Sequence, residues 1–180
     1  MAESSYGGGM PSPIGHALGG LVAGLALTPR STGTLGTFGT LGTVACAAVM
    51  PDLDFLWGRH NMETHSVGAA VLAGLATLVY TRGKDPQLAL AVALAWSTHV
   101  LFDWLGSDDT PPLGVMAIWP LTDSFYFADV FVFDAISRRY WLPNFLSHNV
   151  WAVIKEVLLL GPLAAILFYL RRGSKSLPGA

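Results

Sequence analysis

Charged residues and cysteine are both scarce in this chain of 180 residues, which is 12% charged and contains one cysteine. A soluble domain carries roughly 25% charged residues, so the composition disfavours a water-exposed globular fold. The net charge of -2 provides no basic surface, which argues against nucleic acid as a partner. One cysteine excludes an internal disulfide, and because Cys46 lies in an apolar run we interpret it as a small packing residue.

Hydrophobic residues account for 52% of the chain and are concentrated in five apolar stretches. These cover about 13–28, 34–50, 66–81, 86–105 and 150–170. A membrane-spanning helix needs about 20 residues, so the last two stretches are long enough and the others need flanking residues. No Lys or Arg precedes the first stretch, which favours a retained helix over a cleaved signal peptide. The sequence therefore predicts an all-α fold, a polytopic transmembrane helical bundle of about five spans.

The remaining segments are interpreted from their composition. The aromatic and acidic segment 113–136 is too short and too acidic to span a membrane, so we expect an interfacial or re-entrant helix there. The glycine-rich segment 1–10 is predicted to be a flexible leader, with the folded part beginning near Met10-Pro11. We expect 11–175 to form a single membrane-embedded helical domain.

Glycines recur at regular spacings in the first two stretches. The first contains Gly15-x-x-x-Gly19 and Gly20-x-x-x-Gly24. The second contains Gly33, Gly36, Gly39 and Gly42. Small residues let helix backbones approach closely, so we interpret both patterns as packing surfaces inside a bundle.

Basic residues indicate the orientation of the predicted spans. With five spans, one side of the membrane collects Arg30, Arg82, Lys84, Arg171, Arg172 and Lys175. The other side collects Arg59, Arg138, Arg139 and Lys155. The positive-inside rule makes the first side cytoplasmic. We therefore expect a protein integral to a prokaryotic inner membrane, with the C-terminus inside unless a sixth span moves it across.

Histidine and aspartate residues lie at the ends of the apolar stretches. The predicted topology places four stretch ends on one side of the membrane: the start of the first stretch, the end of the second, the start of the third and the end of the fourth. The residues expected on that side are His16, Asp52, Asp54, His60, His65, His99 and Asp103. Charges that border a membrane are costly unless they are compensated, so such residues are candidates for function. The site is predicted on the non-cytoplasmic face.

The chemistry of this set favours a metal. Neutral imidazole nitrogens and carboxylate oxygens are the usual ligands of zinc and related cations. His99 and Asp103 are spaced i, i+4, so both project from one face of a helix. We predict a divalent metal cofactor of one or more ions, with zinc first and manganese second. Such an ion lowers the pKa of a bound water and generates a hydroxide nucleophile.

Each residue taken alone has a simpler interpretation. His16 could cap a helix or lie at the headgroup level, and Asp52 could be a turn residue. His99 and Asp103 could form a structural hydrogen-bonded pair, and His60 could be a surface loop residue. The residues expected to be solvated or interfacial are Asp108, Asp109, Asp123, Asp129, Asp134 and His148. The metal hypothesis depends on how many ligand-type residues share one face.

Four motifs resemble the membrane-bound metal-dependent hydrolases of bacteria and archaea. In order, they are Pro11-Ser12-Pro13-Ile14-Gly15-His16, Pro51-Asp52-Leu53-Asp54, His60-x4-His65-Ser66 and His99-x3-Asp103-Trp104. The resemblance covers about 10–105, and Trp119-Pro120 extends it. Each motif is weak alone, and the four in this order are specific.

What the resemblance implies is a helical bundle with a His/Asp site that holds more than one metal ion. Carried over residue by residue, the implied ligands are His16, Asp52 or Asp54, His65, His99 and Asp103. The family looks like distant membrane-embedded relatives of zinc-dependent phospholipase C. Those soluble enzymes carry a His-x3-Glu ligand pair, whereas here Ala152 follows His148 at that spacing. This difference argues against the third metal of their cluster.

We predict a metal-dependent hydrolase that acts at the membrane interface, on a phosphoester of a lipid or lipid-linked substrate. Of Asp52 and Asp54, one would orient or deprotonate the attacking water and the other would bind metal. The alternative is a non-catalytic metal-binding membrane protein, such as a sensor or a scaffold. The expected partners are membrane lipids and a lipid or small-molecule substrate. The substrate's identity and the oligomeric state stay open.

Overall fold

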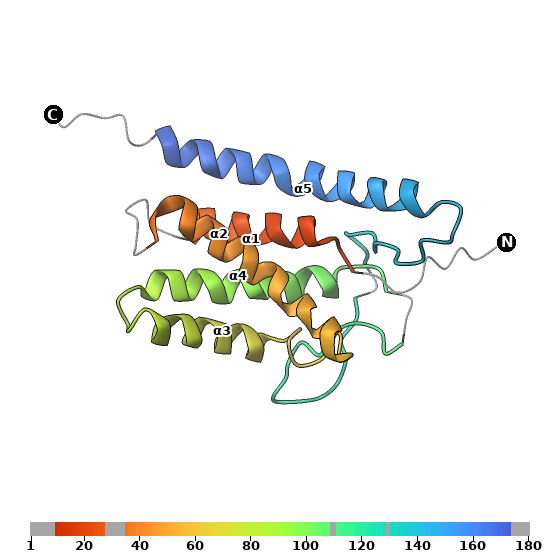
Figure 1. Cartoon of the computed structure of the whole chain (residues 1–180), viewed down its shortest axis with the longest axis horizontal. Helices are drawn as coiled ribbons and strands as arrows, with labels where there is room; N and C mark the ends of the chain where they lie inside the picture. The colour runs from red at the N-terminus through yellow and green to blue at the C-terminus, as the bar shows by residue number, and fades with distance from the viewer. Residues whose placement is uncertain (1–9, 28–34, 109–110, 129, 174–180) are drawn as a thin grey trace.

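The computed structural model describes residues 10–27, 35–108, 111–128 and 130–173 (Figure 1). The named elements in this part of the chain are all helical. In order, they are α1 (Pro13–Leu27), α2 (Gly36–Val49), the 3-10 helix η1 (Met50–Trp57), α3 (Val67–Tyr80), α4 (Pro86–Trp104) and α5 (Phe145–Gly173). The predicted all-α fold is therefore confirmed for the described residues.

Polar caps determine where three of the helices begin. The side chains of Ser12, Ser66 and Asp85 each accept a hydrogen bond from a backbone N–H in the first turn of α1, α3 and α4 respectively. Pro13 and Pro86 follow two of these caps, at positions where a missing N–H costs no helical hydrogen bond. The caps satisfy donors that a helix leaves unpaired at its start, and so fix these boundaries.

Helix α4 is the centre of the bundle and packs against α1, α2 and α3, whereas α5 packs against α1. Figure 1 shows α5 at the top, α3 at the bottom and α2 passing obliquely in front of α4. The starts of α1, α3 and α5 lie at the same end of the bundle as the ends of α2 and α4. The alternation of direction that we predicted from the apolar stretches is therefore present in the fold.

The glycines of α1 allow close contact with its neighbours, as predicted. A Cβ atom at Gly20 would lie 2.5 Å from the carbonyl oxygen of Val44 on α2, and one at Gly24 would lie 2.6 Å from a Val44 methyl. A Cβ atom at Gly19 would lie 2.5 Å from the ring of Phe102 on α4. These distances are too short for real contacts, so only glycine permits this approach of the helices.

The glycines of α2 do not form the packing surface that we expected. A Cβ atom at Gly36 or Gly42 would meet no described atom within 4 Å, and Gly33 lies outside the described residues. Because α2 and α3 both pack on α4 and not on each other, an open groove of about 530 Å³ lies between them, lined in part by Gly39 and Gly42. The packed half of α2 instead joins a core cluster of Val44, Ala47, Ala48, Leu88, Ala91, Val92 and Ala95.

The connection between α4 and α5 corrects another prediction, because 113–136 contains no helix among its described residues. Its backbone groups pair across the segment, in isolated bridges between Val115 and Tyr126 and between Gly106 and Phe133. Val115 and Phe133 are buried in apolar clusters with residues of α4. Some of the backbone donors are thus satisfied without helical hydrogen bonds, and the segment is a loop anchored over the end of the bundle.

Met10 belongs to the fold, although we placed it in the flexible leader. It is 7% exposed and packs with Val100 and Val115. Its carbonyl oxygen accepts a hydrogen bond from Ile136 N at 3.0 Å. The rest of the predicted leader, 1–9, lies outside the described residues.

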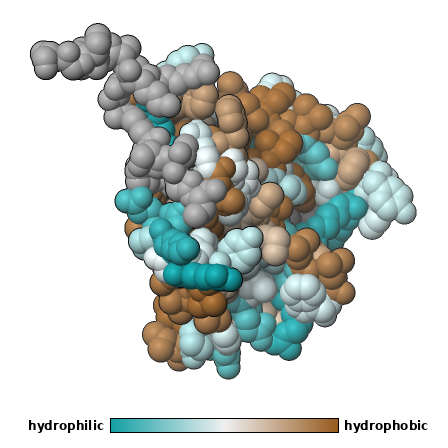
Figure 2. Space-filling view, turned by 60° about the vertical axis from the view of Figure 1, so that its left-hand side comes forward, coloured by the Kyte–Doolittle hydropathy of each residue, from teal (hydrophilic) through white to brown (hydrophobic). Residues whose placement is uncertain are grey.

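Within the described residues, two segments are long and apolar enough to cross a membrane. They are Gly36–Trp57, which joins α2 and η1 over 22 residues, and Phe145–Arg171 of α5, with 27 residues. Only 11% of the apolar window of α5 is buried, unlike the core helix of a soluble protein. Figure 2 shows hydrophobic side chains over large parts of one face of the molecule. Two of the five expected spans therefore meet the combined criterion of length and hydropathy. Helices α1 and α3 have 15 and 14 residues, and α4, with 19 residues, is not among the candidates.

Gly20→Ala is expected to destabilise the bundle by about 1–3 kcal/mol, because the added methyl would overlap the Val44 carbonyl. Gly42→Ala is the matched control, since its position is open and alanine favours helix by up to about 1 kcal/mol. Thermal unfolding of both variants in detergent measures the difference. Equal stability of the two variants would contradict the close contact between α1 and α2.

Candidate metal centre

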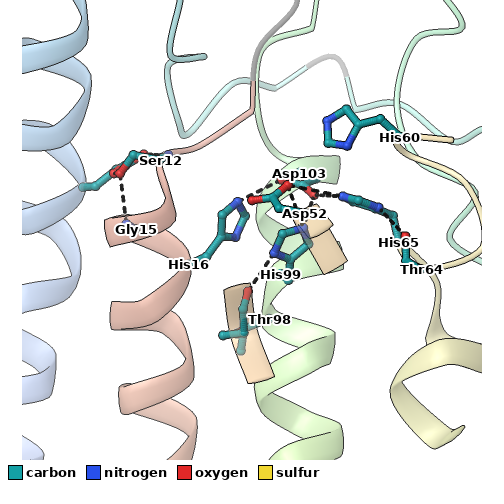
Figure 3. Close-up of polar contacts among 12 residues, drawn as sticks. Ser12, Gly15, His16, Asp52, His60, Thr64, His65, Thr98, His99 and Asp103 are labelled. Atoms are coloured by element: carbon teal, nitrogen blue, oxygen red, sulfur yellow. Dashed lines mark hydrogen bonds and ion pairs between the residues drawn. The ribbon is translucent and has the colours of Figure 1, made fainter. Parts of the chain in front are cut away.

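The seven His and Asp residues predicted on one side of the membrane lie together at one end of the bundle. His16 is in the first turns of α1, and His99 and Asp103 are in the last turns of α4. The others lie in η1 and the loop that follows it, and are Asp52, Asp54, His60 and His65. Figure 3 shows the side chains of His16, Asp52, His65, His99 and Asp103 directed toward one another, with His60 farther out.

The carboxylate of Asp103 is the centre of the cluster. Its Oδ1 lies 3.2 Å from His16 Nε2, and its Oδ2 lies 2.9 Å from His99 Nε2. The same Oδ2 lies 3.4 Å from His65 Nε2. All four side chains are 0% exposed, so one carboxylate faces three imidazole nitrogens away from water.

Asp52 completes the cluster on the side that is open to solvent. Its Oδ1 lies 3.7 Å from both His65 Nε2 and His99 Nε2. Its side chain is 17% exposed, in contrast to the complete burial of these two histidines. Asp52 is therefore the member of the cluster that a water or a substrate would reach first.

Hydrogen bonds outside the cluster fix which nitrogen of two histidines faces inward. His99 Nδ1 donates to the carbonyl oxygen of Ala48 at 2.7 Å, which assigns the ring proton to Nδ1. His65 Nδ1 lies 3.1 Å from Asp54 Oδ2 and donates in the same way. When the two rings are neutral, Nε2 of each carries a lone pair directed at Asp103.

The inward-facing atoms need a cation between them. The lone pair of His99 Nε2 and the carboxylate oxygen of Asp103 repel each other at 2.9 Å unless a proton or a metal ion lies between them. Six such buried atoms have no hydrogen-bond partner within the described residues. They are His16 Nδ1 and Nε2, His65 Nε2, His99 Nε2, and Oδ1 and Oδ2 of Asp103. An unpaired buried polar atom costs about 1–3 kcal/mol, which a shared divalent ion would offset.

The distances between the ligand atoms fit a metal ion. Two ligand atoms bound to one tetrahedral zinc lie about 3.3–3.6 Å apart. The contacts of 3.2 and 3.4 Å from Asp103 are close to that separation. Three groups have ligand atoms within 4.8 Å of one another: His16 with Asp52 and His99, Asp52 with His60 and His65, and His65 with His99 and Asp103. The residues therefore fit a divalent ion, and which metal binds stays a prediction.

Asp54 lies at the predicted end of the bundle, where both of its carboxylate oxygens contact protein donors. Its Oδ1 accepts a hydrogen bond from His60 Nδ1 at 2.8 Å, and its Oδ2 accepts one from Thr64 Oγ1 at 2.8 Å and faces His65 Nδ1. Both oxygens are thus occupied by protein donors, and Asp54 is in none of the three ligand groups of the described residues. In such a position a carboxylate would orient His60 and His65 if these histidines bound a metal ion.

With no metal ion bound, protonation of His65 would compensate the surrounding carboxylates. Burial lowers the pKa of His65, but the adjacent carboxylates of Asp52, Asp54 and Asp103 raise it to about 9. At neutral pH a proton on this ring therefore supplies part of the charge that the cluster needs. A metal ion bound at Nε2 would replace that proton.

Glu156 of α5 is a residue of this region that we did not single out in the sequence. It is 1% exposed, accepts a hydrogen bond from Ser12 N at 2.6 Å and also accepts one from the Ser12 hydroxyl. A Cβ atom at Gly15 would lie 2.7 Å from its Cδ. Glu156 thus joins α5 to the first turn of α1, which carries His16. A carboxylate inside an apolar stretch is the signal that could have identified it.

Arg138 is the second residue that we did not single out. Its guanidinium carbon lies 3.7 Å from the centroid of the Phe55 ring, and its Nη2 lies 3.4 Å from His60 Nε2. Burial lowers the pKa of Arg138, while the carboxylates of Asp52 and Asp54 act in the opposite direction. No spacing in the sequence indicates this position, because Arg138 reaches the site through the loop before α5.

The residues predicted to be solvated or interfacial lie outside the cluster. Asp134 forms an ion pair with a lysine of α5, Asp108 accepts a hydrogen bond from a loop N–H, and Asp123 is exposed. His148 Nε2 donates to a loop carbonyl at 2.7 Å. Two of these residues lie outside the described part of the chain, Asp109 and Asp129.

The described residues form a helical bundle with two apolar candidate membrane spans and a buried His/Asp cluster at one end, as in a membrane protein with a candidate metal centre. The chain belongs to the family described as YdjM inner membrane protein, which it matches over residues 10–175. No curated protein and no solved structure matches the chain. The predicted location in the inner membrane is confirmed by the family. The match gives no support for similarity to hydrolases or to phospholipase C, which stays a prediction.

The double variant His65→Ala, His99→Ala is expected to lose bound metal, because it removes two of the three Nε2 atoms that face Asp103. Elemental analysis of protein purified in detergent without chelator should find one or more equivalents of a divalent metal in the wild type and little in the variant. His148→Ala is the control, since this histidine lies outside the cluster. Wild-type protein that holds no metal, even after metal is added back, would contradict the site.

Proposed function

We propose that this chain is a metal-dependent hydrolase of the inner membrane that cleaves a phosphoester at the level of the lipid headgroups. The observation that best supports the proposal is the set of unpaired nitrogen and oxygen atoms around Asp103, beside the partly exposed Asp52. A divalent ion bound there would supply Lewis acidity and an activated water. A catalytic site keeps an open position whereas a structural site is closed, so the exposure of Asp52 favours catalysis.

In this proposal the residues of the site have three tasks. The residues that hold the ion are His16, His65, His99 and Asp103. Asp52 orients the attacking water and takes its proton, because it faces the same nitrogens from the side open to solvent. Asp54 accepts the Nδ1 proton of His65 and so keeps Nε2 directed into the site.

The groove between α2, α3 and α4 favours a lipid substrate over a soluble one. It has a volume of about 530 Å³, and its lining includes Met50 and Trp96. Met50 begins η1, which carries Asp52, and the Trp96 indole N–H donates to the Thr64 carbonyl at 2.8 Å, next to His65 in the chain. An acyl chain in this groove would therefore lie beside the metal centre, with its headgroup at the end of the bundle.

The alternative is a non-catalytic metal-binding membrane protein, such as a sensor or a scaffold. The observation that favours it is the complete burial of four side chains of the cluster, as in a closed structural site. The two proposals differ in whether a water next to the ion can react with a substrate. Hydrolysis by the metal-loaded protein discriminates between them.

Asp52→Asn is expected to lower phosphodiester hydrolysis by about 10²–10⁴-fold, because the amide cannot accept the proton of the attacking water. The fully buried ligands remain, so the metal content should change little. Asp123→Asn, at an exposed position, is the matched control. Release of nitrophenol from bis(p-nitrophenyl) phosphate and cleavage of phosphatidylglycerol vesicles are the readouts. A metal-loaded wild type that cleaves neither substrate would favour the sensor or scaffold.

We also propose that all five helices cross the membrane and that the metal centre is on the non-cytoplasmic side. Two segments are long enough to span alone, and the shorter helices lie alongside them between the same two ends of the bundle (Figure 1). A short apolar helix can be accommodated by local thinning of the bilayer. Arg82 and Lys84 lie in the turn between α3 and α4, at the end opposite the site, which agrees with the positive-inside rule.

Reporter fusions test this orientation. A fusion after Arg171 should report the cytoplasmic side, and one after Asp123 should report the opposite side, because α5 lies between them. Green fluorescent protein, which fluoresces inside, and alkaline phosphatase, which is active outside, give complementary signals. If both fusions report the same side of the membrane, α5 does not span it. If the Arg171 fusion reports the outside and the Asp123 fusion the inside, the proposed orientation is wrong.

A further inference from the structure

Arg138 is held in a fixed position at the outer edge of the candidate metal centre. Its guanidinium stacks on Phe55, with Cζ 3.7 Å from the ring centroid. Phe55 in turn stacks on His60, with ring centroids 3.7 Å apart and the ring planes inclined by 30°. A guanidinium stacked on an aromatic face keeps the N–H donors along its edge free for other partners.

Two other basic side chains near this end of the bundle have carboxylate partners. Arg59 pairs with Glu63, and Lys155 pairs with Asp134. Within the described part of the chain, Arg138 has no carboxylate at ion-pair distance and makes one long hydrogen bond, of 3.4 Å, to His60 Nε2. Since a guanidinium has five N–H donors, most of those on Arg138 are available to a ligand.

A chain of contacts connects Arg138 with the metal centre. His60 Nε2 faces Arg138, and His60 Nδ1 donates to Asp54 Oδ1 at 2.8 Å. The other oxygen of Asp54 lies 3.1 Å from His65 Nδ1. Two side chains, those of His60 and Asp54, therefore connect Arg138 with His65, a proposed metal ligand.

We propose that Arg138 forms an anion subsite that binds the phosphate group of the substrate beside the metal centre. The stacked guanidinium can present two parallel N–H donors, which match two oxygens of a phosphate group. The carboxylates of Asp52 and Asp54 repel an approaching anion, and a cation at the opening compensates that repulsion. The identity of the substrate rests on the proposed hydrolase function, whereas phosphate binding by Arg138 can be measured without turnover.

Calorimetric titration of the full chain in detergent tests the subsite, with inorganic phosphate and dihexanoyl phosphatidic acid as probes. Arg138→Ala is expected to weaken the binding of both probes by about tenfold or more. Arg138→Lys should restore only part of the affinity, because a lysine cannot bind two oxygens in parallel. Arg59→Ala is the matched control, since that arginine is exposed and already paired with Glu63.

Unchanged affinity in Arg138→Ala, or no phosphate binding by the wild type, would overturn the subsite. A loss of metal in both Arg138 variants would also overturn it, in favour of a purely structural role. Tighter binding of phosphatidic acid than of inorganic phosphate would assign the anion to a lipid headgroup, and equal binding would assign it to a free phosphate group. The same titrations after chelator treatment separate the anion subsite from the hydrolase function. If Arg138 still binds phosphate when the metal has been removed, the subsite stands even if the protein is not a hydrolase.

Discussion

The burial of one carboxylate, Asp103, among three imidazoles is the constraint on which the rest of the structure depends. Its oxygens lie 2.9 to 3.4 Å from nitrogens of His16, His65 and His99, and none of these side chains reaches solvent. Buried charges of this kind rarely stabilise a fold, because apolar side chains of the same volume usually do so equally well or better. The cluster is therefore better explained by the binding of a cation than by the stability of the bundle.

The bundle holds each ligand-type residue on a separately anchored element. The first turn of α1 carries His16 and is tied to α5 by the hydrogen bonds between Ser12 and Glu156. Helix α4 carries Asp103 and is packed on three sides by other helices. The loop that carries His65 is held against α4 by the hydrogen bond from the Trp96 indole to the Thr64 carbonyl. A preformed site needs this kind of support, because ligands on mobile elements would separate under their mutual repulsion.

The sequence was informative where a property depends on the direction of the chain and uninformative where it depends on contacts between distant segments. The lengths of the apolar stretches placed His16 and Asp103 at the same end before any contact was known. The spacing of Gly42 in α2 resembled that of Gly20 in α1, yet only Gly20 has a neighbour, because spacing defines a helix face and not what covers it. The position of Arg138 depends on the path of a loop that contains no periodic pattern.

The charges of the site are arranged from negative inside to positive outside. Asp103 lies deepest, Asp52 is 17% exposed, and Arg138 is outermost at the protein surface. A divalent ion would reduce the negative charge of the interior, and the arginine at the opening would leave a net attraction for an anionic group. Because the exposed members of the site, Asp52 and His60, lie at its outer side, a reacting group would approach the end of the bundle instead of entering it. A phosphate at the level of the lipid headgroups meets that requirement, since its apolar tail can stay in the bilayer beside α2 and α3 while the phosphate contacts the site.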